Sequence, residues 1–406
     1  MWLTSALLMT SLGWQPAASS EEWPGWRGPG GLGRAVQAGP VRWTATEGIR
    51  WKTPLSGGGI SCPIVSGDCV FVTTSDGPRQ GDLHLVCLDR DSGQERWTAS
   101  FWGTAPTLYH ATKGGMATPT PVADGKYVYA FFGTGDVFCV DYSGELQWQR
   151  SLAKEYGAFE NRFGHTSSPI LHGDLLIVQC DHYGQSYMVA INRRTGADSW
   201  KMDRPGRWHS WSSPLMVTVG GKPQLVVCSS GKVEGLAADT GSTLWFLEGL
   251  ERECIPTPVF DGHRIYAVSG PKGKTFALRP GGQGDVAATH VDWVVARGGP
   301  FVPSPILAGD LLYLVDDQGI CTCLDTHNGK RVWQKRLPGA YTASPVAAGG
   351  LVYFMNEAGE TTIVRAGIRQ FEQVARTELG EPVFASPAVA DGALFVRTSR
   401  HLVRID

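Results

Sequence analysis

The fold is decided by a phrase that first occurs as Cys87-Leu88-Asp89-Arg90-Asp91-Ser92-Gly93-Gln94-Glu95-Arg96-Trp97. An Asx residue such as Asp89 bonds its own backbone two residues further on, and a glycine such as Gly93 accepts a positive φ angle. The apolar residues before Asp89 are too few for a helix. The phrase therefore predicts a β-hairpin that leads into an outer strand bearing Trp97.

The glycine and tryptophan of this phrase recur with the same spacing further along the chain. The other copies are Gly144 with Trp148, Gly196 with Trp200, Gly241 with Trp245, and Gly329 with Trp333. A large aromatic residue at one repeated place suits packing between neighbouring repeat units better than a role in cofactor binding.

A second element of the repeat lies upstream of each hairpin. It consists of Ser/Thr-Pro, an apolar pair, a Gly/Asp turn and a short apolar run. Its prolines are Pro63, Pro121, Pro169, Pro214, Pro258, Pro305, Pro345 and Pro387. The mean interval is about 46 residues, a period typical of propeller blades or helical arrays.

Strand chemistry favours the propeller. Runs such as Cys69–Val72 and Leu311–Leu314 are β-branched or aromatic and follow turn residues, which is typical of buried strands. The eighth copy reaches Ile405 and Asp406 without its tryptophan, and residues 45–52 contain Trp51. We therefore expect an all-β, eight-bladed β-propeller of four-stranded antiparallel blades, closed by this N-terminal strand, which removes two sheet edges.

Composition excludes several function classes. The chain has 406 residues, a formal net charge of −2 and 52 glycines. Such a charge carries no basic footprint for nucleic acid and no polybasic membrane patch. Beyond the N-terminus there is no run of about 18 apolar residues, so no membrane span is expected.

The N-terminus divides into two short segments before the propeller at residues 45–406. Residues 1–20 contain an apolar run followed by small residues, which predicts a secretory signal peptide and an exported protein of the periplasm or cell envelope. Residues 21–44 contain Trp23-Pro24-Gly25-Trp26-Arg27-Gly28-Pro29. We expect this segment to be a clamp that packs on the ring, with Arg27 stacked between the two tryptophans by cation–π contact.

Nine cysteines are present, and none forms a C-x-x-C motif. Cys87, Cys139 and Cys323 occupy the place held by Ala190 in a sister copy. The cysteines are therefore expected to be free, buried thiols rather than disulfides.

These repeats resemble the pyrroloquinoline-quinone (PQQ) repeat β-propellers, whose blades carry an Ala-x-Asp-x-x-Thr-Gly-x-x-x-Trp phrase. The resemblance covers nearly all of residues 45–406, and exported members often open with a W-P-x-[FW]-R-G-P segment similar to residues 23–29. In organisation the chain resembles exported outer-membrane-assembly propellers more than quinoprotein dehydrogenases. The resemblance implies the propeller fold and leaves the activity open.

Candidate binding residues lie in the loops that enter the innermost strands, which meet at the mouth of the central channel. These loops are long and polar in the second to fifth repeats, so one side of the mouth should be richer in charge and imidazole. The ligand- or partner-binding candidates are Arg162, His165, Arg207, Trp208, His209, Arg252 and Glu253. Loops carry function more often than the scaffold does. Two histidines without a carboxylate partner fall short of a metal site, and no catalytic residue is assigned.

The preferred interpretation is a non-enzymatic exported scaffold that binds an envelope protein or a small polar ligand at the channel mouth, without a cofactor. The alternative is a PQQ- and Ca²⁺-dependent quinoprotein oxidoreductase of alcohols or sugars. Quinoprotein dehydrogenases commonly stack a vicinal Cys-Cys disulfide on the quinone. This sequence has no adjacent cysteine pair, only Cys321-x-Cys323.

Overall fold

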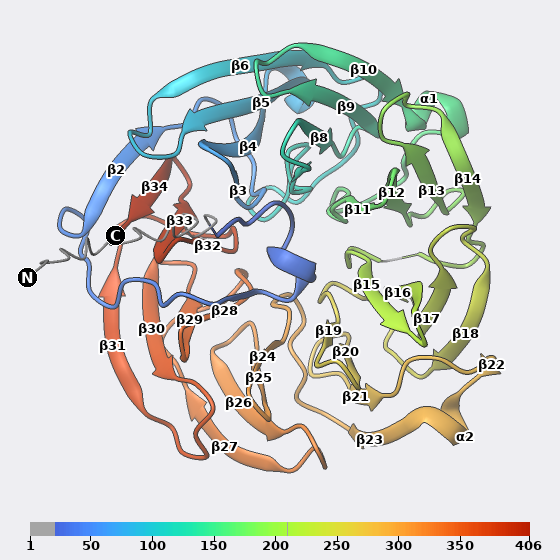
Figure 1. Cartoon of the computed structure of the whole chain (residues 1–406), viewed down its shortest axis with the longest axis vertical. Helices are drawn as coiled ribbons and strands as arrows, with labels where there is room; N and C mark the ends of the chain where they lie inside the picture. Colours follow the sequence, from blue (N-terminus) through green and yellow to red (C-terminus); the bar gives the residue numbers. More distant parts are fainter. Residues whose placement is uncertain (1–20, 209) are drawn as a thin grey trace, which may run out of the picture.

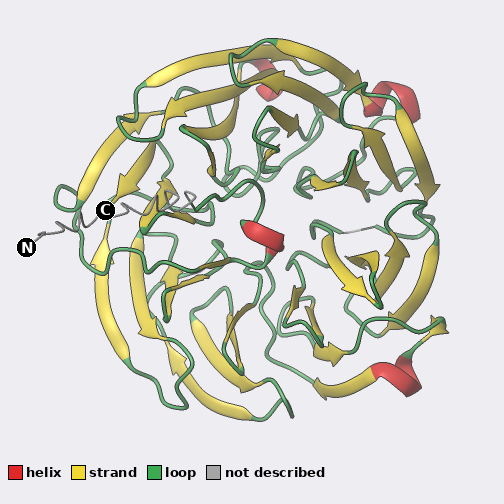
Figure 2. Cartoon of the chain, viewed as in Figure 1, coloured by secondary structure: helices red, strands yellow, loops and turns green. Residues whose placement is uncertain are grey.

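The ring of eight sheets predicted from the repeats is present. The computed structural model describes residues 21–208 and 210–406, so the predicted signal segment at residues 1–20 and the candidate His209 lie outside the described residues. Each sheet is an antiparallel meander of four strands, with one strand added in two sheets. Figure 1 shows the sheets arranged around a central axis, and Figure 2 shows how little helix there is between them.

The first four blades follow one another in chain order. Blade 1 contains β3 (Ile64–Ser66), β4 (Cys69–Asp76), β5 (Asp82–Asp89) and β6 (Glu95–Trp102); blade 2 contains β7 (Val122–Ala123), β8 (Tyr127–Phe131), β9 (Asp136–Asp141) and β10 (Leu146–Ser151). Blade 3 contains β11 (Ile170–His172), β12 (Leu175–Cys180), β13 (Tyr187–Asn192) and β14 (Asp198–Asp203); blade 4 contains β15 (Leu215–Val219), β16 (Lys222–Ser229), β17 (Lys232–Ala237), β18 (Thr243–Glu248) and the added β22 (Gly284–Asp285).

The remaining blades complete the circle. Blade 5 contains β19 (Val259–Phe260), β20 (Ile265–Val268), β21 (Thr275–Leu278) and β23 (Val291–Val295); blade 6 contains β24 (Ile306–Ala308), β25 (Leu311–Val315), β26 (Ile320–Asp325) and β27 (Arg331–Arg336). Blade 7 contains β28 (Val346–Ala348), β29 (Leu351–Met355), β30 (Glu360–Arg365), β31 (Gln373–Glu378) and the added β1 (Arg34–Ala35); blade 8 contains β32 (Ala388–Ala390), β33 (Ala393–Arg397), β34 (His401–Ile405) and β2 (Ile49–Pro54). The short helices are η1 (Pro29–Gly31), η2 (Pro78–Gln80), α1 (Leu152–Tyr156) and α2 (Ala287–His290).

Blade 8 is assembled from both ends of the chain. The strand expected at residues 45–52 occupies Ile49–Pro54 (β2) and pairs antiparallel with the C-terminal strand β34. Trp51 lies opposite Arg404, and its Nε1 donates to the carbonyl oxygen of Arg90 in blade 1 at 2.9 Å. Residues from the two ends thus complete one blade and bind it to the next.

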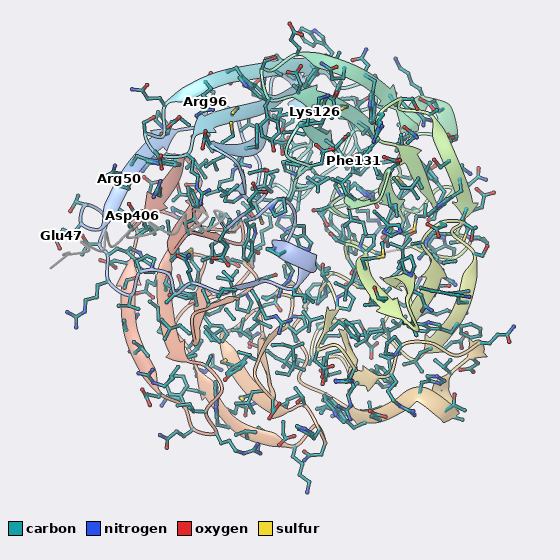
Figure 3. The ribbon with its side chains drawn as sticks, in the orientation of Figure 1. Glu47, Arg50, Arg96, Lys126, Phe131 and Asp406 are labelled. Carbon is teal, nitrogen blue, oxygen red and sulfur yellow. The ribbon has the colours of Figure 1, made fainter. Side chains whose placement is uncertain are left out.

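The hydrophobic core lies between blades. The second and third strands of the blades are almost wholly buried, because both faces of each sheet are covered by neighbouring sheets; continuous apolar runs in short strands reflect that burial. The outermost strands alternate between exposed and partly covered residues. Figure 3 shows Glu47 and Arg50 on the outer circumference, whereas Phe131 is buried within the ring.

The repeated tryptophans join neighbouring blades, as the sequence predicted. Besides Trp51, four others each donate Nε1–H to a backbone oxygen in the hairpin of the next blade: Trp97 to Tyr142, Trp148 to Arg193, Trp200 to Ala238, and Trp293 to Thr326, at 2.9–3.1 Å. The hairpin glycine lies against the ring of the preceding tryptophan. A Cβ atom added at Gly93 would lie 2.4 Å from the Trp51 ring, so the glycine serves packing as well as the turn.

Trp245 departs from this hydrogen-bond pattern, although it still packs in a buried cluster with Ile265 and Leu278 of blade 5. Its Nε1 donates to Gln224 of its own blade at 2.9 Å. Gly235, opposite Trp245, leaves room for the indole, since a Cβ there would lie 2.0 Å from the Trp245 ring. The added strand β22 pairs beside Trp245 through Gly284 and occupies the edge next to it.

All nine cysteines are free and buried, as the sequence predicted. Cys87, Cys139 and Cys323 each lie opposite a repeated tryptophan, where Ala190 lies in blade 3. Within the described residues, no helix is long and apolar enough to cross a membrane.

The segment at residues 21–44 winds across one end of the ring. Trp23 exchanges two backbone hydrogen bonds with Val65 of blade 1, and β1 pairs parallel with β28 of blade 7. Figure 1 shows η1 near the central axis. The expected stacking of Arg27 on the two tryptophans is replaced by hydrogen bonds from the guanidinium to the carbonyl oxygens of Pro305, at 2.7 Å, and Leu32, at 3.4 Å.

Candidate functional site

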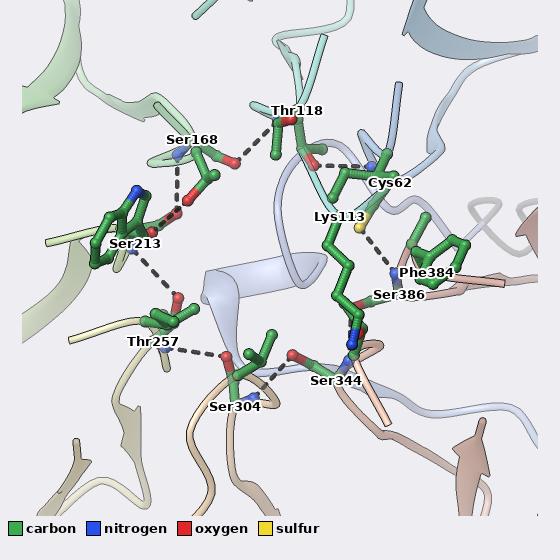
Figure 4. Close-up of a pocket in the computed structure, with 18 of the residues that line it drawn as sticks. Cys62, Lys113, Thr118, Ser168, Ser213, Thr257, Ser304, Ser344, Phe384 and Ser386 are labelled. Carbon is green, nitrogen blue, oxygen red and sulfur yellow. Dashed lines mark hydrogen bonds between the residues drawn. The ribbon is translucent and has the colours of Figure 1, made fainter. Parts of the chain in front are cut away.

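A closed circle of hydrogen bonds surrounds the central axis. It is formed by the residue immediately before each blade proline, and we call it the hydroxyl ring: Cys62, Thr120, Ser168, Ser213, Thr257, Ser304, Ser344 and Ser386. The backbone N–H of each residue donates to the side-chain Oγ or Sγ atom of the next blade, at 2.8–3.4 Å. Figure 4 shows part of this circle around the axis.

The hydroxyl ring explains why the repeat contains Ser/Thr-Pro. The innermost strand begins after the proline, so the N–H before it has no partner within its own sheet and needs an acceptor from another blade. A short hydroxyl side chain reaches across at that point. Blade 1 uses Cys62 instead, whose Sγ accepts from the backbone N–H of Ser386 at 3.2 Å. Burial raises the pKa of the Cys62 thiol.

The hydroxyl ring lines a cavity of about 480 Å³ on the axis. A second layer comes from the residue two positions before each ring member: Ile60, Thr118, Thr166, Trp211, Ile255, Val302, Thr342 and Phe384. The mouth is lined by His110, Lys113, Phe163, Glu253, Phe301 and Asp317. All eight blades therefore contribute to the walls, in layers that repeat the symmetry of the fold.

Two carboxylates beside the mouth have defined partners. Glu357, in the turn between β29 and β30, accepts from Lys113 at 2.6 Å and from the Thr342 hydroxyl at 2.7 Å. Asp317, in the turn between β25 and β26, accepts from the backbone N–H of Phe301 at 3.0 Å. Burial raises the pKa of Asp317.

The opposite end of the cavity is covered by the segment at residues 21–44. Trp26 lines the cavity, and its Nε1 donates to the Thr257 hydroxyl of the ring at 2.9 Å. Arg27 is 2% exposed, and burial lowers its pKa to about 9. The cavity is thus open towards the mouth and closed by the chain's own N-terminal segment.

Two of the sequence candidates come from the loop before blade 3 and lie apart. The Arg162 guanidinium is exposed and lies 5.8 Å from the centre of the Tyr183 ring. His165 is buried between Phe131 and Phe159, with ring centres 5.2 and 5.3 Å away. Burial, with the charge of nearby His182, lowers the pKa of His165 to about 3, so it stays neutral at physiological pH.

Arg207 belongs to a buried ionic network between blades 3 and 4. It donates twice to Glu234, at 3.0 and 2.8 Å, and Arg204 joins Glu234 to Asp181. Burial acts to raise the pKa of Glu234, but the hydrogen bonds from Arg207 and the charge of Arg204 outweigh it and lower this pKa. Trp208, beside this network, is 41% exposed.

The last two candidates lie in the loop before blade 5. Arg252 is exposed and lines a smaller pocket together with Glu251, Glu253 and Pro271. Glu253 also lines the central cavity. Of the six described candidates, Glu253 is the one that contributes to the cavity wall.

Sequence reasoning missed two groups of residues. The residues of the hydroxyl ring are the Ser or Thr of the Ser/Thr-Pro element in the sequence. Their hydrogen bonds could not be predicted, because each one is made with the neighbouring blade. Asp317 and Glu357 come from turns between the second and third strands, which lie at the same end as the loops entering the blades. Blades 6 and 7 therefore also supply charge at the mouth, besides His110, Lys113 and Glu253 from the loops of the second to fifth repeats.

Three exposed apolar side chains lie on the loops that enter blades 2, 3 and 4, and one of them, Phe163, lines the mouth of the cavity. We call them the apolar rim: Leu108, Phe163 and Trp208, which are 72%, 44% and 41% exposed. Their loops contact one another, since the Phe163 ring lies 6.1 Å from that of Trp211 and the backbone oxygen of Phe163 accepts from His110. The loops enter blades 2, 3 and 4 in succession.

The eight repeated blades, the inter-blade tryptophans and the axial hydroxyl ring define a PQQ-repeat β-propeller. The sequence matches the family described as outer membrane protein assembly factor BamB over residues 37–187, 81–335 and 282–372. The chain belongs to this family.

Individual relatives are distant. The chain is 23% identical over 269 residues to outer membrane protein assembly factor BamB of Yersinia pestis, a match covering 66% of this chain and 61% of that protein. The matched part thus spans about three fifths of the relative's length.

Solved structures share the fold at low identity. BamB from Moraxella catarrhalis has a TM-score of 0.60 at 12% identity, covering 88% of this chain and 99% of that one. A quinohemoprotein alcohol dehydrogenase from Pseudomonas putida has a TM-score of 0.68 at 11% identity, covering 95% of this chain and 80% of that one. At such identities the likeness concerns the fold alone.

Proposed function

We propose that this protein is a non-enzymatic, exported scaffold of the cell envelope that binds a partner protein through the apolar rim. The observation that carries the proposal is the exposure of Leu108, Phe163 and Trp208 on three successive loops at the mouth. Gathered exposed apolar side chains on a soluble fold mark interaction sites. The family's description as an outer membrane protein assembly factor supports a partner within the envelope.

The chemistry of the rim suits a protein partner. Aromatic and arginine side chains dominate the energetics of protein interfaces. Arg162, next to Phe163, and Arg252, in the loop before blade 5, are exposed, so they add charged side chains beside the apolar residues. We propose that these arginines, with Glu253, orient the partner, whereas Phe163 and Trp208 supply most of the affinity.

The quinoprotein alternative is weakened by the residues of the cavity, which do not fit a PQQ and Ca²⁺ centre. The cysteines are free, and no two of them are consecutive in the sequence. Among the described residues, the carboxylates lining the cavity are Glu253 and Asp317. Asp317 is occupied by a backbone N–H and has a raised pKa, which disfavours the charged form that a cation requires.

Site-specific photocrosslinking in the native cell tests the scaffold proposal. A photoreactive residue is placed at Leu108, Phe163 or Trp208, and at Val294 as control. Val294 is 45% exposed but lies on the outer strand of blade 5. We expect the three rim positions to give the same envelope-protein adduct, identified by mass spectrometry, and Val294 to give none.

A binding measurement with the identified partner completes the test. Replacing Phe163 and Trp208 by serine should weaken binding by about 100-fold or more, as expected for aromatic anchors, and Val294→Ser should leave it unchanged. Equal labelling at Val294, or dye-linked oxidation of alcohols or sugars by the purified protein with PQQ and Ca²⁺, would contradict the proposal.

A further inference from the structure

The hydroxyl ring presents unused hydrogen-bond donors to the cavity. Its seven Oγ atoms each accept a backbone N–H. Thr120 and Ser386 also bond the Cys62 thiol, which leaves five hydroxyl groups whose O–H has no acceptor among the described residues. All seven side chains are buried. Because a hydroxyl carries one donor, these five donors around the axis are available to an oxygen acceptor that enters the cavity.

Positive charge is buried beside this ring. Arg27 Nη2 donates to the backbone oxygen of Pro305, next to Ser304, and Arg397 Nη1 donates to the Ser61 hydroxyl, next to Cys62, both at 2.7 Å. Burial lowers their pKa values to about 9 and about 10, so both are cationic at neutral pH.

The two guanidinium groups are 2% and 3% exposed, and among the described residues no carboxylate acts on either of them. Arg27 also has two nitrogen atoms, Nε and Nη1, without a described hydrogen-bond partner. Buried charge of this kind is costly unless an opposite charge compensates it. Arg27 lies on the closed side of the hydroxyl ring and Arg397 on the side of the mouth, both behind the cavity wall. Their charge therefore favours an anionic oxygen group bound at the ring.

The rest of the cavity has a different character. Trp211, Phe163, Phe301 and Phe384 form an aromatic wall. At the mouth, Lys113 is paired with Glu357, whereas Glu253 and Asp317 add carboxylates. Cationic groups thus lie beside the hydroxyl ring, and at the mouth Glu253 provides a carboxylate.

We infer that the cavity binds a ligand with a carboxylate at one end, an apolar body and a cationic group at the other end. The carboxylate accepts hydrogen bonds from the hydroxyl ring, the body lies along the aromatic wall, and the cation lies beside Glu253. A cavity of about 480 Å³ lies within the range of about 300–1,000 Å³ typical of small-molecule sites. This site goes beyond the proposed function, since it concerns the channel interior rather than the rim.

Two sources present this chemistry: a free amino-carboxylic acid, or the C-terminus of a polypeptide with a basic residue before an apolar last residue. Calorimetric titration of the purified full chain distinguishes them. The probes are 6-aminohexanoate and a tetrapeptide ending in lysine and phenylalanine with a free carboxyl group. Hexylamine and the C-terminal amide of the same peptide are the controls.

We expect at least one acid to bind about tenfold or more tightly than its control without the carboxylate, as charged hydrogen bonds predict. Tryptophan fluorescence should change on binding, because Trp26 and Trp211 line the cavity. Tighter binding of 6-aminohexanoate identifies a free acid, and tighter binding of the peptide identifies a chain terminus. Equal affinity of acid and control, or no binding of either acid at millimolar concentration, overturns the inference.

A matched pair of variants locates the binding site. Phe384→Ala removes an aromatic ring that lines the cavity. Phe371→Ala removes a ring outside the cavity, whose centre lies 5.3 Å from that of Trp333. We expect Phe384→Ala to weaken binding about tenfold, and Phe371→Ala to leave it unchanged, with both variants folded by circular dichroism. An equal loss in both overturns the assignment to the cavity. Because no partner protein is present, failure here leaves the rim proposal standing.

Discussion

Cys62 occupies in blade 1 the position that serine or threonine occupies in the other blades of the hydroxyl ring. Its Sγ accepts the backbone N–H of Ser386, the bond between blades 8 and 1. This bond lies where the first and last repeats meet, so the thiol contributes to closure of the ring on its inner side. At the residue scale, one sulfur atom replaces a hydroxyl group without interrupting the circle.

Removing that acceptor should lower the free energy of unfolding by more than the loss of a buried sulfur atom alone. In Cys62→Ala, the Ser386 N–H is left buried without a partner, which costs about 1–3 kcal/mol. Cys228→Ala is the control, because Cys228 is also buried but its thiol makes no hydrogen bond with the described residues. We expect urea unfolding to show a larger loss for Cys62→Ala than for Cys228→Ala, and little change for Cys62→Ser. Equal losses for the two alanine variants would contradict this account.

At the scale of elements, the hairpin glycine and the outer-strand tryptophan act as a pair that joins blades. The repeat predicted both the turn and the packing, because their spacing is fixed along one chain. A β-bulge beside the tryptophan interrupts the outer strand pair of blade 1, between Cys87 and Leu88, and was not predicted. Such bulges depend on how a strand curves around the ring, which local propensity does not report.

Gly93 gives the clearest test of this pairing. Its φ is +69°, and an added Cβ would lie 2.4 Å from the Trp51 ring. Gly93→Ala should therefore combine backbone strain of about 1–2 kcal/mol with an overpacking cost of about 1–3 kcal/mol. Gly173 also has a positive φ, +54°, but nothing within 4 Å of an added Cβ, so Gly173→Ala should show the strain alone. If thermal unfolding shows equal losses, the tryptophan contact is not the cause.

At the scale of the whole molecule, Glu381 connects the two ends of the chain. It accepts from Lys52 on β2 at 2.8 Å and from His401 on β34 at 3.0 Å. Burial acts to raise its pKa, but the hydrogen bonds from Lys52, Thr398 and His401 together outweigh it and lower the pKa to about 2.

The stability that Glu381 contributes should depend on pH with a definite sign. A carboxylate whose pKa is lower in the folded state stabilises the fold above its ordinary pKa of 4.5, and loses that contribution as the pH falls towards about 2. Glu381→Gln should lower the free energy of unfolding by about 3 kcal/mol at pH 7, and the difference from wild type should narrow between pH 5 and pH 2. Glu378→Gln, on an exposed outer position, should show no such change. A constant difference across this range would exclude Glu381 as the source.

The candidate site was less predictable than the ring. Glu253 was named in advance and lines the cavity, whereas His165 proved to be buried between two phenylalanines. The polar character of a loop shows that it reaches the mouth, but the direction of each side chain depends on the neighbouring blade. Asp317 and Glu357 were missed because the turns that carry them look like ordinary hairpins.

The sequence by itself determined the number of blades, their strand chemistry and the place of the inter-blade tryptophans, because these properties repeat along the chain and depend on local turns and apolar runs. Only the tertiary structure decided that the residues before the prolines join into a hydroxyl ring, and that residues 21–44 cover one end of the cavity. It also placed buried guanidinium groups beside that ring and carboxylates at the mouth. These features bring together residues up to hundreds of positions apart, so their contacts exist only once the ring has closed.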